Sequence, residues 1–429
     1  MIEEKLAAFA DHSGNPGHAM DILRLSLLDW CAVGIAGGNE PVAHILRDQV
    51  LEEGGANQAS LIGVDIKVPA CSAALVNGAI SHALDYDDTH FAHIGHPSVA
   101  IIPAALAVAQ MVGCSGRELQ EAALIGAEAS IRMGVWLGRS HYQTGFHQTA
   151  TAGAFGACLA ACRLLSLSHD QTIHALGLVS TRASGLQSQF GTMGKSMNAG
   201  IAARNGVEAA LLARRGFVSR ATALDGPQGF GPTHQGEAQN AAWDGIGQNW
   251  LFERVEHKFH ACCHGLHAML EALPPRDGIA LGDMDQIEIT THPRWLSVCN
   301  IEAPATDLEA KFSYRMTAAM RLLGHDTSLP GSFTDSLCGD GDIVSLREKV
   351  TVMGCDRLSE MQVRVVLRGA DGSEQVLTHD LEAPLPYAER EARVSTKAAA
   401  LIGAPRARAL WQMICDEAAP NDIAAALTK

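Results

Sequence analysis

The stretch Ser81–Ser98 reads SHALDYDDTHFAHIGHPS, and the surrounding chain is organised around it. Apolar, alanine-rich segments flank it, CSAALVNGAI at 71–80 and VAIIPAALAVAQMV at 99–112, and their patterns predict buried helices. Because buried unpaired charge is costly, a dense polar cluster between two core helices must find partners or water. Perturbed pKa values gather in such clusters, so we expect a functional site here. The cluster contains four histidines and three carboxylates: His82, His90, His93, His96, Asp85, Asp87 and Asp88.

Two other interpretations of this stretch stay open at this point. The first is a solvated loop with incidental histidines. The second is a zinc or iron site, because His90, His93 and His96 with the aspartates are suitable ligand types. The spacing matches no standard metal motif, since neither HExxH nor a CxxC partner is present. Histidine and carboxylate are also the commonest general acid–base groups, so the sequence favours acid–base chemistry without a metal.

Composition narrows the class of protein. The 429 residues suffice for two or three domains, and 47% hydrophobic with 18% charged residues predicts a large core. A net charge of −15 argues against nucleic acid as the main partner. The acidic start MIEEKLAAFADHSG predicts no signal peptide, and no charge-free run is long enough to cross a membrane. Eleven cysteines, many in apolar segments, suggest reduced thiols in a cytoplasmic protein.

The order of elements predicts a mainly α fold with a smaller α+β domain. Helical patterns follow one another from the N-terminus, and the pattern changes at Pro274-Pro275. Beyond it, 285–293 alternates like a strand, and 361–368 with 374–379 resemble a hairpin around 370–372. The last two segments are helical and are expected to pack on the helical body. We therefore predict an all-helical domain at 1–271 and 391–429 and an α+β domain at 272–390.

Two more polar islands interrupt the helices. RSHYQTGFHQTATAG at 139–153 contains Tyr142 and His147, and LQSQFGTMGKSMNAG at 186–200 contains Lys195. A lysine in a glycine-rich turn between apolar helices suits close approach to a ligand. This turn is not a phosphate-binding loop, because GTMGKS lacks the GxxxxGK[ST] spacing.

A fourth island, VEHKFHACCHGLHAMLEAL, spans 255–273. Its spacing predicts that His260, His264 and His267 share one face of a helix. Its two cysteines are adjacent, so on a helix they point apart, and no CxxC or CxxxC accompanies them. An iron–sulfur cluster is therefore not expected.

Six motifs taken together resemble one protein family. They are HALDYDDTH and GHPS in the first island, GFHQTATAGAFGA, GKSMNAGIAARNG, KFHACCHGLH and EAKFSY. This combination is similar to the MmgE/PrpD family, which includes 2-methylcitrate dehydratase, cis-aconitate decarboxylase and iminodisuccinate epimerase. The resemblance implies a large all-helical domain closed by both chain ends, with an inserted α+β domain. It also implies a homodimer and catalysis without metal or organic cofactor.

The resemblance also implies a set of site residues at the matching motif positions. One position departs from the family. In the decarboxylase members a histidine follows the lysine of KFHACCHGLH by five residues, whereas this chain has Cys263 there and His264 next. The chain is also shorter than the methylcitrate dehydratases. The expected catalytic residues are Asp85, His96, His147, Lys195 and Tyr314, and the expected substrate-binding residues are Thr89, Lys258, Cys263 and His264.

These residue types suit proton transfer beside carboxylates. Lys195 and Lys258 would hold substrate carboxylates and stabilise the enediolate that forms when a neighbouring carbon loses its proton. His147 or His96 could take that proton, with Asp85 orienting a histidine. Tyr314 could protonate a leaving hydroxyl or the opposite face of the carbanion.

We therefore expect a cofactor-independent lyase of a small di- or tricarboxylic acid, with dehydration favoured over decarboxylation. The alternative is an epimerase or isomerase of a substituted dicarboxylate such as iminodisuccinate. A non-catalytic helical interaction protein and a zinc hydrolase are the candidates from other classes.

Overall fold

The computed structural model describes residues 1–274 and 284–428. Its contacts divide the chain into two compact units, Met1–His257 with Val394–Lys429, and Lys258–Arg393. Residues 258–271 thus belong to the smaller unit, whereas the sequence assigned them to the helical domain. The reason is that α11 (His267–Ala272) packs on the β-sheet of the smaller unit. Pro275, one of the two prolines that suggested the boundary, lies outside the described residues.

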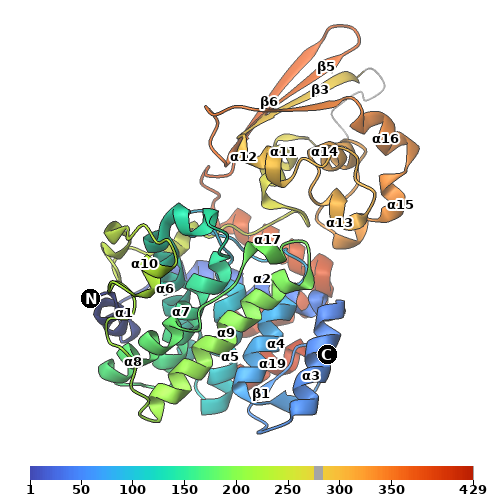
Figure 1. Cartoon of the computed structure of the whole chain (residues 1–429). Coiled ribbons are helices and arrows are strands. Elements are labelled where there is room, and N and C mark those ends of the chain that lie inside the picture. The colour runs from blue at the N-terminus through green and yellow to red at the C-terminus, as the bar shows by residue number, and fades with distance from the viewer. Residues whose placement is uncertain (275–283, 429) are drawn as a thin grey trace. The chain divides into compact units, whose positions relative to one another are not determined.

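The larger unit consists of packed helices and one two-stranded β-sheet (Figure 1). Residues that were predicted as helical do form helices, and the segment 59–70 supplies the two short strands. The elements are α1 (Ile2–Ala10), α2 (His18–Gly37), α3 (Pro41–Glu53), β1 (Ala59–Ser60), β2 (Lys67–Val68), α4 (Ala70–Ser81), α5 (Ser98–Val112), α6 (Gly116–Gln143), α7 (Gln148–Leu164), α8 (His169–Ser180), α9 (Met193–Arg214) and α10 (Phe230–Thr233), with 3₁₀ turns at Gln187–Gln189, Asn240–Trp243 and Leu251–Arg254.

Capping residues explain several helix ends. Ser115 and Glu118 form a capping box at the start of α6. Gly113 ends α5 in the left-handed conformation, with φ 74° and ψ 38°. α9 begins at Met193, earlier than the sequence indicated, because the Thr192 hydroxyl accepts the Gly194 N–H at 3.1 Å. Lys195 therefore lies in the first turn of a helix and not in a loop.

Glycines allow α4 and α9 to approach closely. A Cβ on Gly200 would lie 2.2 Å from the Leu75 oxygen, and one on Gly78 would lie 2.9 Å from the Gly200 Cα. Gly78 precedes His82 by about one helical turn, and Gly200 follows Lys195 by between one and two turns. The contact thus brings the C-terminal end of α4 beside the N-terminal end of α9.

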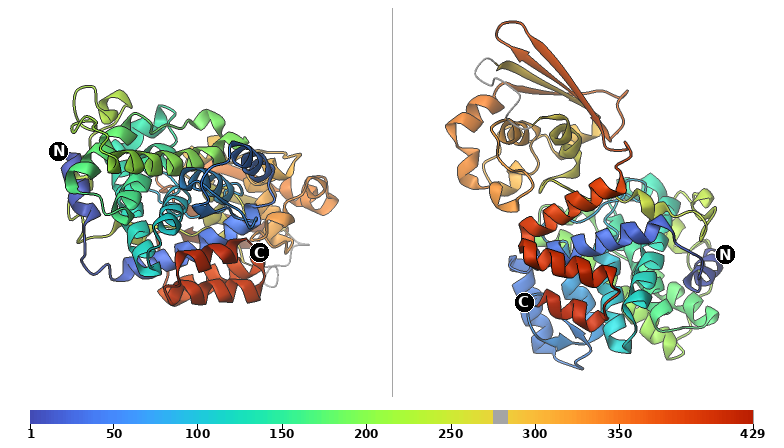
Figure 2. Two further views of the ribbon diagram at one scale, coloured as in Figure 1. Left: turned by 90° about the horizontal axis from the view of Figure 1, so that it is seen from below. Right: turned by 180° about the vertical axis from the view of Figure 1, so that it is seen from behind.

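The C-terminal helices return to the helical unit, as predicted. They are α17 (Tyr387–Ile402), α18 (Ala404–Cys415) and α19 (Pro420–Leu427), drawn in red in Figure 2. α18 packs on α2, and α19 packs on α2 and α5. Lys397 of α17 anchors this return, because its Nζ lies 2.6 Å from Asp29 Oδ1 of α2 and donates to the Tyr86 carbonyl at 2.6 Å.

The smaller unit contains a four-stranded sheet with the order β4-β3-β5-β6. β3 pairs in parallel with β4 and antiparallel with β5, and β5 and β6 form the predicted hairpin. α11 packs on β5 and β6, and α14 packs on α11, α16 and β4. The elements are α11, β3 (Met284–Thr291), α12 (Arg294–Val298), α13 (Asp307–Ala310), α14 (Tyr314–Leu322), α15 (Asp335–Cys338), α16 (Gly341–Arg347), β4 (Val350–Gly354), β5 (Gln362–Gly369) and β6 (Glu374–Asp380), with 3₁₀ turns at His264–Leu266 and Pro330–Ser332.

The fold is therefore mainly α with a smaller α+β region. Within residues 1–274 and 284–428, no helix combines the length and the apolar character needed to cross a bilayer.

Candidate active site

The histidine- and aspartate-rich loop connects the end of α4 to the start of α5. Two of its residues have left-handed backbone conformations, Asp85 with φ 50° and Ile94 with φ 53°. Such a conformation is tolerated by aspartate but is unusual for β-branched isoleucine, so surrounding contacts must hold the loop in place. One such contact is the paired backbone bridge between Thr89 and Glu256, with N–O distances of 2.9 and 2.7 Å. Thr89, an expected substrate-binding residue, thus fixes the loop through its main chain.

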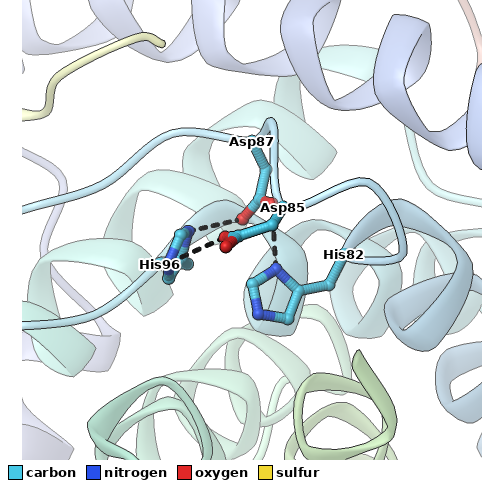
Figure 3. Close-up of side chains that lie close together, drawn as sticks. All are labelled: His82, Asp85, Asp87 and His96. Atoms are coloured by element: carbon cyan, nitrogen blue, oxygen red, sulfur yellow. Dashed lines mark hydrogen bonds and ion pairs between the residues drawn. The ribbon is translucent and has the colours of Figure 1, made fainter. Parts of the chain in front are cut away.

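Asp87 joins two imidazoles at the base of the loop (Figure 3). Its Oδ1 lies 2.9 Å from His82 Nδ1, and its Oδ2 lies 2.9 Å from His96 Nδ1. A carboxylate at neutral pH only accepts, so His82 Nδ1 donates to Oδ1, whereas His96 Nδ1 and Oδ2 form an ion pair. Burial by itself would raise the pKa of Asp87, but the two imidazoles outweigh burial and hold that pKa well below its usual range. Asp87 therefore remains ionised and orients both rings.

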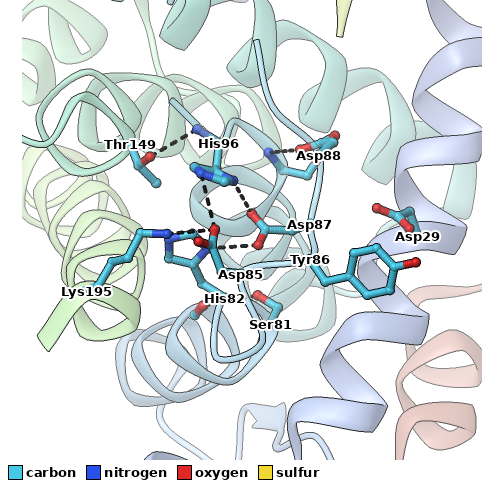
Figure 4. A network of polar contacts seen from close by, with 12 residues as sticks. Asp29, Ser81, His82, Asp85, Tyr86, Asp87, Asp88, His96, Thr149 and Lys195 are labelled. Atoms are coloured by element: carbon cyan, nitrogen blue, oxygen red, sulfur yellow. Dashed lines mark hydrogen bonds and ion pairs between the residues drawn. The ribbon is translucent and has the colours of Figure 1, made fainter. Parts of the chain in front are cut away.

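Asp85 forms the second part of the cluster and pairs with Lys195 of α9. Its Oδ1 lies 2.6 Å from Lys195 Nζ and 3.6 Å from His96 Nε2 (Figure 4). The second distance is too long for a direct hydrogen bond but lies within ion-pair range. The main chain of His96 is held separately, because its N–H donates to Thr149 Oγ1 at 3.0 Å.

Exposure separates these residues into an accessible and a buried layer. The side chains of Asp85, Lys195 and His96 are 30%, 17% and 12% exposed, whereas those of His82 and Asp87 are at most 1% exposed. Only the first three are placed to meet a small molecule. The buried pair supports them from behind.

His147 borders the same cluster from the start of α7. Its ring stacks on His82 with centroids 6.0 Å apart and meets the edge of Phe190 at 5.0 Å. Burial lowers the pKa of His147 well below its usual value, and the positive charges of His82 and Lys195 lower that pKa further. His147 is therefore neutral near pH 7.

The four residues His82, Asp85, Asp87 and His96 also meet a distance test for metal binding, since their potential ligand atoms lie within 4.8 Å of one another. Their donor types suit zinc or iron. The existing contacts suit protons better, because both Nδ1 atoms lie 2.9 Å from Asp87 and the Lys195 ammonium pairs with Asp85. A metal ion would have to break these bonds and would be repelled by the ammonium.

Asp88 points away from this cluster into the helical core, as Figure 4 shows. The Ser98 hydroxyl donates to its Oδ2 at 2.5 Å, and the Ser98 N–H donates to its Oδ1 at 3.2 Å. Burial raises the pKa of Asp88 to about 7, so two adjacent aspartates have opposite pKa shifts. Asp88 binds Ser98, the first residue of α5, and is not oriented toward the exposed layer.

The smaller unit contains the other four expected site residues. Burial lowers the pKa of His267 well below its usual value, and the charges of His264, His260 and Lys258 lower it further, so these groups lie around His267. The three histidines gather without sharing a helix face, since α11 begins only at His267. This corrects the prediction of one helix face, whose spacing assumed a helix throughout the island.

Tyr314 and Cys263 have identifiable partners within the smaller unit. The Tyr314 hydroxyl donates to the Gly265 carbonyl at 2.6 Å and lies 3.0 Å from Thr291 Oγ1. Burial, with the nearby Cys299 thiol, raises the pKa of Tyr314 well above its usual value. Cys263 is half-buried and its thiol interacts with that of Cys299. The catalytic role expected for Tyr314 remains a prediction.

The structure thus brings together Asp85, His96, His147 and Lys195, all expected from the sequence. Sequence reasoning placed Asp87 and His82 in the polar cluster but assigned neither of them a role in the site. It also missed Asn198 of α9, whose amide reaches His147. The first two carried a signal, because a buried histidine usually has a carboxylate or carbonyl partner nearby; the third carried none.

Comparison with known proteins agrees with the motif resemblance. Residues 4–241 match the model of the MmgE/PrpD N-terminal domain, and residues 260–404 match that of the MmgE/PrpD C-terminal domain. Cis-aconitate decarboxylase of Aspergillus terreus is 26% identical over 417 residues, covering 87% of this chain and 82% of that protein. The human cis-aconitate decarboxylase is 27% identical over 369 residues, covering 80% and 75%.

A further relative is the cis-aconitate decarboxylase-like protein oryM of Aspergillus oryzae, which is 30% identical over 276 residues. That match covers 60% of this chain and 57% of the relative, so this chain spans little more than half of that protein. The two family models together extend over both compact units. The chain belongs to the MmgE/PrpD family.

Proposed function

We propose that this protein is a lyase of a small di- or tricarboxylic acid and that its own side chains supply the chemistry. The observation that carries the proposal is the accessible group Lys195, Asp85 and His96, supported from behind by Asp87. It combines a cation with an imidazole whose tautomer is fixed. A carboxylate substrate needs the former, and transfer of a proton needs the latter.

The proposed mechanism assigns a separate task to each residue. Lys195 holds a substrate carboxylate, and its charge stabilises the electron pair that develops on the neighbouring carbon. Asp87 Oδ2 lies 2.9 Å from His96 Nδ1, so the neutral form of His96 would carry its hydrogen on Nδ1 and present a lone pair on Nε2. His96 can then remove a carbon-bound proton, or in its protonated form return one. Asp85 places the Lys195 ammonium beside His96.

We propose decarboxylation of an unsaturated tricarboxylate such as cis-aconitate as the first candidate reaction. Of the three relatives described above, two are named cis-aconitate decarboxylases and one is named a cis-aconitate decarboxylase-like protein. In this reaction the bond to one carboxylate breaks and carbon dioxide leaves. The electron pair moves into the allylic system, and a proton from the enzyme completes the product. The sequence alone favoured dehydration, so this ordering differs from the first expectation.

Dehydration remains the second candidate, and Cys263 is the reason. The decarboxylase members have a histidine at this position, and a thiol cannot carry the positive charge that a protonated imidazole offers to a carboxylate. In dehydration, His96 would remove a proton beside a carboxylate and the hydroxyl would leave as water after protonation. Both reactions use Lys195 and His96 in the same positions.

A substrate screen tests the proposal. The purified protein is incubated in deuterated water with citrate, 2-methylcitrate, cis-aconitate, itaconate and iminodisuccinate, and each reaction is followed by NMR and mass spectrometry. Loss of carbon dioxide identifies a carboxy-lyase, and loss of water identifies a hydro-lyase. Inversion without loss of carbon dioxide or water, with uptake of one deuterium, would instead show the epimerase alternative. No change in any acid would contradict the proposal for this substrate class.

A homodimer in a cytoplasmic setting is also proposed, and it rests on the family resemblance and on the cysteine content alone. One chain has a mass of 45.3 kDa. Light scattering after size exclusion should give twice that mass. A mass equal to one chain at micromolar concentration would contradict the dimer.

A further inference from the structure

Asn198 lies in α9 about one turn after Lys195 and faces His147. It is 5% exposed. Its Nδ2 lies 3.2 Å from His147 Nδ1 and 3.3 Å from the Leu186 carbonyl oxygen. The sequence gave no reason to single it out.

The Leu186 carbonyl decides the orientation of this amide. A carbonyl oxygen only accepts hydrogen bonds, so the atom of Asn198 that faces it must be the NH₂ nitrogen. That nitrogen has two hydrogens, one for Leu186 and one for His147. His147 Nδ1 is therefore an acceptor and carries no hydrogen in this arrangement.

The backbone at 185–186 holds both partners in register. The Gly185 carbonyl accepts the His147 N–H at 3.0 Å, and Leu186 receives the Asn198 amide. Gly185 has φ 139°, and a Cβ there would lie 2.4 Å from Ala150 Cβ and 3.3 Å from Asn198 Cγ. Because glycine has no side chain, the segment at 185–186 can approach both His147 and Asn198.

We propose that Asn198 is a positioning residue that keeps the proton of neutral His147 on Nε2, so that His147 offers substrate an N–H group and not a lone pair. This inference rests on the proposed function, because it assigns the polarity of one group in that site. His147 would then help Lys195 to hold a substrate carboxylate or its developing negative charge. Of the two histidines that the sequence offered as proton acceptor, His96 is then the one that accepts the proton.

The contrast with the other two imidazoles supports this assignment. His82 and His96 each direct Nδ1 at the ionised Asp87, so both carry hydrogen on Nδ1. His147 directs Nδ1 at an amide donor. The rings thus differ in what Nδ1 faces, a carboxylate at His82 and His96 and an amide donor at His147. The low pKa of His147 keeps the ring in its neutral form.

Ring-nitrogen NMR on protein labelled with ¹⁵N-histidine tests the proposal. Long-range proton–nitrogen correlations at pH 7.5 report which nitrogen of each ring carries hydrogen, and His147→Gln identifies the signals of His147. The expected wild-type pattern has Nε2 protonated and Nδ1 bare. In Asn198→Asp a carboxylate replaces the donor, so Nδ1 should become protonated. In Asn198→Ala, which removes both groups, a mixture of tautomers is expected.

The matched control is Asn205→Asp in the same helix. Asn205 bonds to Arg182 and not to His147, accepting from Arg182 and donating to its carbonyl at 2.9 Å. The control should leave the His147 signals unchanged. A wild-type His147 with hydrogen on Nδ1, or an unchanged pattern in both Asn198 variants, would overturn the proposal.

Turnover provides a second reading. If the screen identifies a substrate, Asn198→Asp should lower kcat at least about tenfold, with Asn198→Ala in between and Asn205→Asp near wild type. The NMR experiment needs no substrate. A failed substrate screen with the expected tautomer would therefore reject the proposed function alone, and a normal screen with the wrong tautomer would reject the role of Asn198 alone.

Discussion

Replacing Asp87 with asparagine tests the support behind the accessible groups. The substitution keeps the shape of the side chain but exchanges one acceptor oxygen for a donor NH₂ group. Asp87 accepts a hydrogen bond from His82 at 2.9 Å through Oδ1 and forms an ion pair with His96 at 2.9 Å through Oδ2. In Asp87→Asn, one of the two rings must therefore lose its bond or change its tautomer.

The expected effect follows from these bonds. A hydrogen bond to a charged group contributes about 1.5–3 kcal/mol, which corresponds to about a 10- to 150-fold change in rate if it is lost in the transition state. We expect kcat to fall by that factor. KM should change less than about threefold, because Asp87 is 1% exposed and does not reach the substrate. The assay is steady-state kinetics on the acid that the screen identifies.

Asp88→Asn is the matched control for this experiment. Asp88 is the neighbouring residue, is also 1% exposed and bonds to Ser98 instead of a histidine. It should retain kcat within about threefold, and both variants should be checked for folding by circular dichroism. Equal activity in Asp87→Asn and wild type would refute the reasoning, as would equal losses in the two variants.

Four further predictions concern charge, packing, pH and metal. Lys195→Met should lower kcat/KM by about 10- to 150-fold through loss of a charge-assisted bond to substrate, with Lys195→Arg partly active; unchanged kinetics would exclude the carboxylate-holding role. Gly200→Ala should lower the free energy of unfolding by about 1–3 kcal/mol in denaturant titrations, because the added Cβ would lie 2.2 Å from the Leu75 oxygen. Gly113→Ala is the control, because the space around this residue at the end of α5 is open and the substitution tests only backbone strain. Burial raises the pKa of Asp88 to about 7, so its protonated form stabilises the fold fully below about pH 4, and this stability is lost as the pH rises through 7. Asp88→Asn should therefore show a smaller fall in the free energy of unfolding between pH 4 and 7 than wild type. Parallel curves for wild type and variant would contradict this prediction. Elemental analysis should find no stoichiometric zinc or iron, and a chelator should leave activity intact, because Asp87 already contacts both His82 and His96. Loss of activity that returns when one metal is added would contradict this prediction.

The sequence predicted much of the fold because its helices have local signals. The capping box of Ser115 and Glu118 lies at the start of α6, and the left-handed Gly113 lies at the end of α5. The hairpin β5–β6 followed from alternation around a glycine turn. The start of α9 at Met193 also had a local signal in Thr192, but the glycines around Lys195 hid it.

The boundary of the smaller unit had no such signal. The prolines at 274–275 suggested a break, yet α11 packs on β5 and β6, which come later in the chain. Only long-range contacts reveal that arrangement. The same limit explains the fourth island, where periodicity suggested one helix and the structure has a 3₁₀ turn before α11.

The candidate site was predicted as a group but not in its internal arrangement. The motif correctly indicated that histidines and aspartates form the cluster. The spacing of these residues could not predict which side chains Asp85 and Asp87 contact. The left-handed backbone at Asp85 directs it toward Lys195, and Asp87 faces the two imidazoles. A pairing that depends on one φ angle and on a lysine from a distant helix has no signature in local sequence.

The measurement that tests the central claim most directly compares wild type with His96→Gln on the acid consumed in the screen. Glutamine keeps a polar side chain of similar reach but cannot transfer a proton near neutral pH. The account predicts that wild type converts the acid with loss of carbon dioxide or water and that His96→Gln loses at least about 100-fold in kcat, within the range typical of general acid–base catalysis. Unchanged turnover by His96→Gln, in a variant shown to be folded, would contradict the claim that this cluster carries out the proton chemistry.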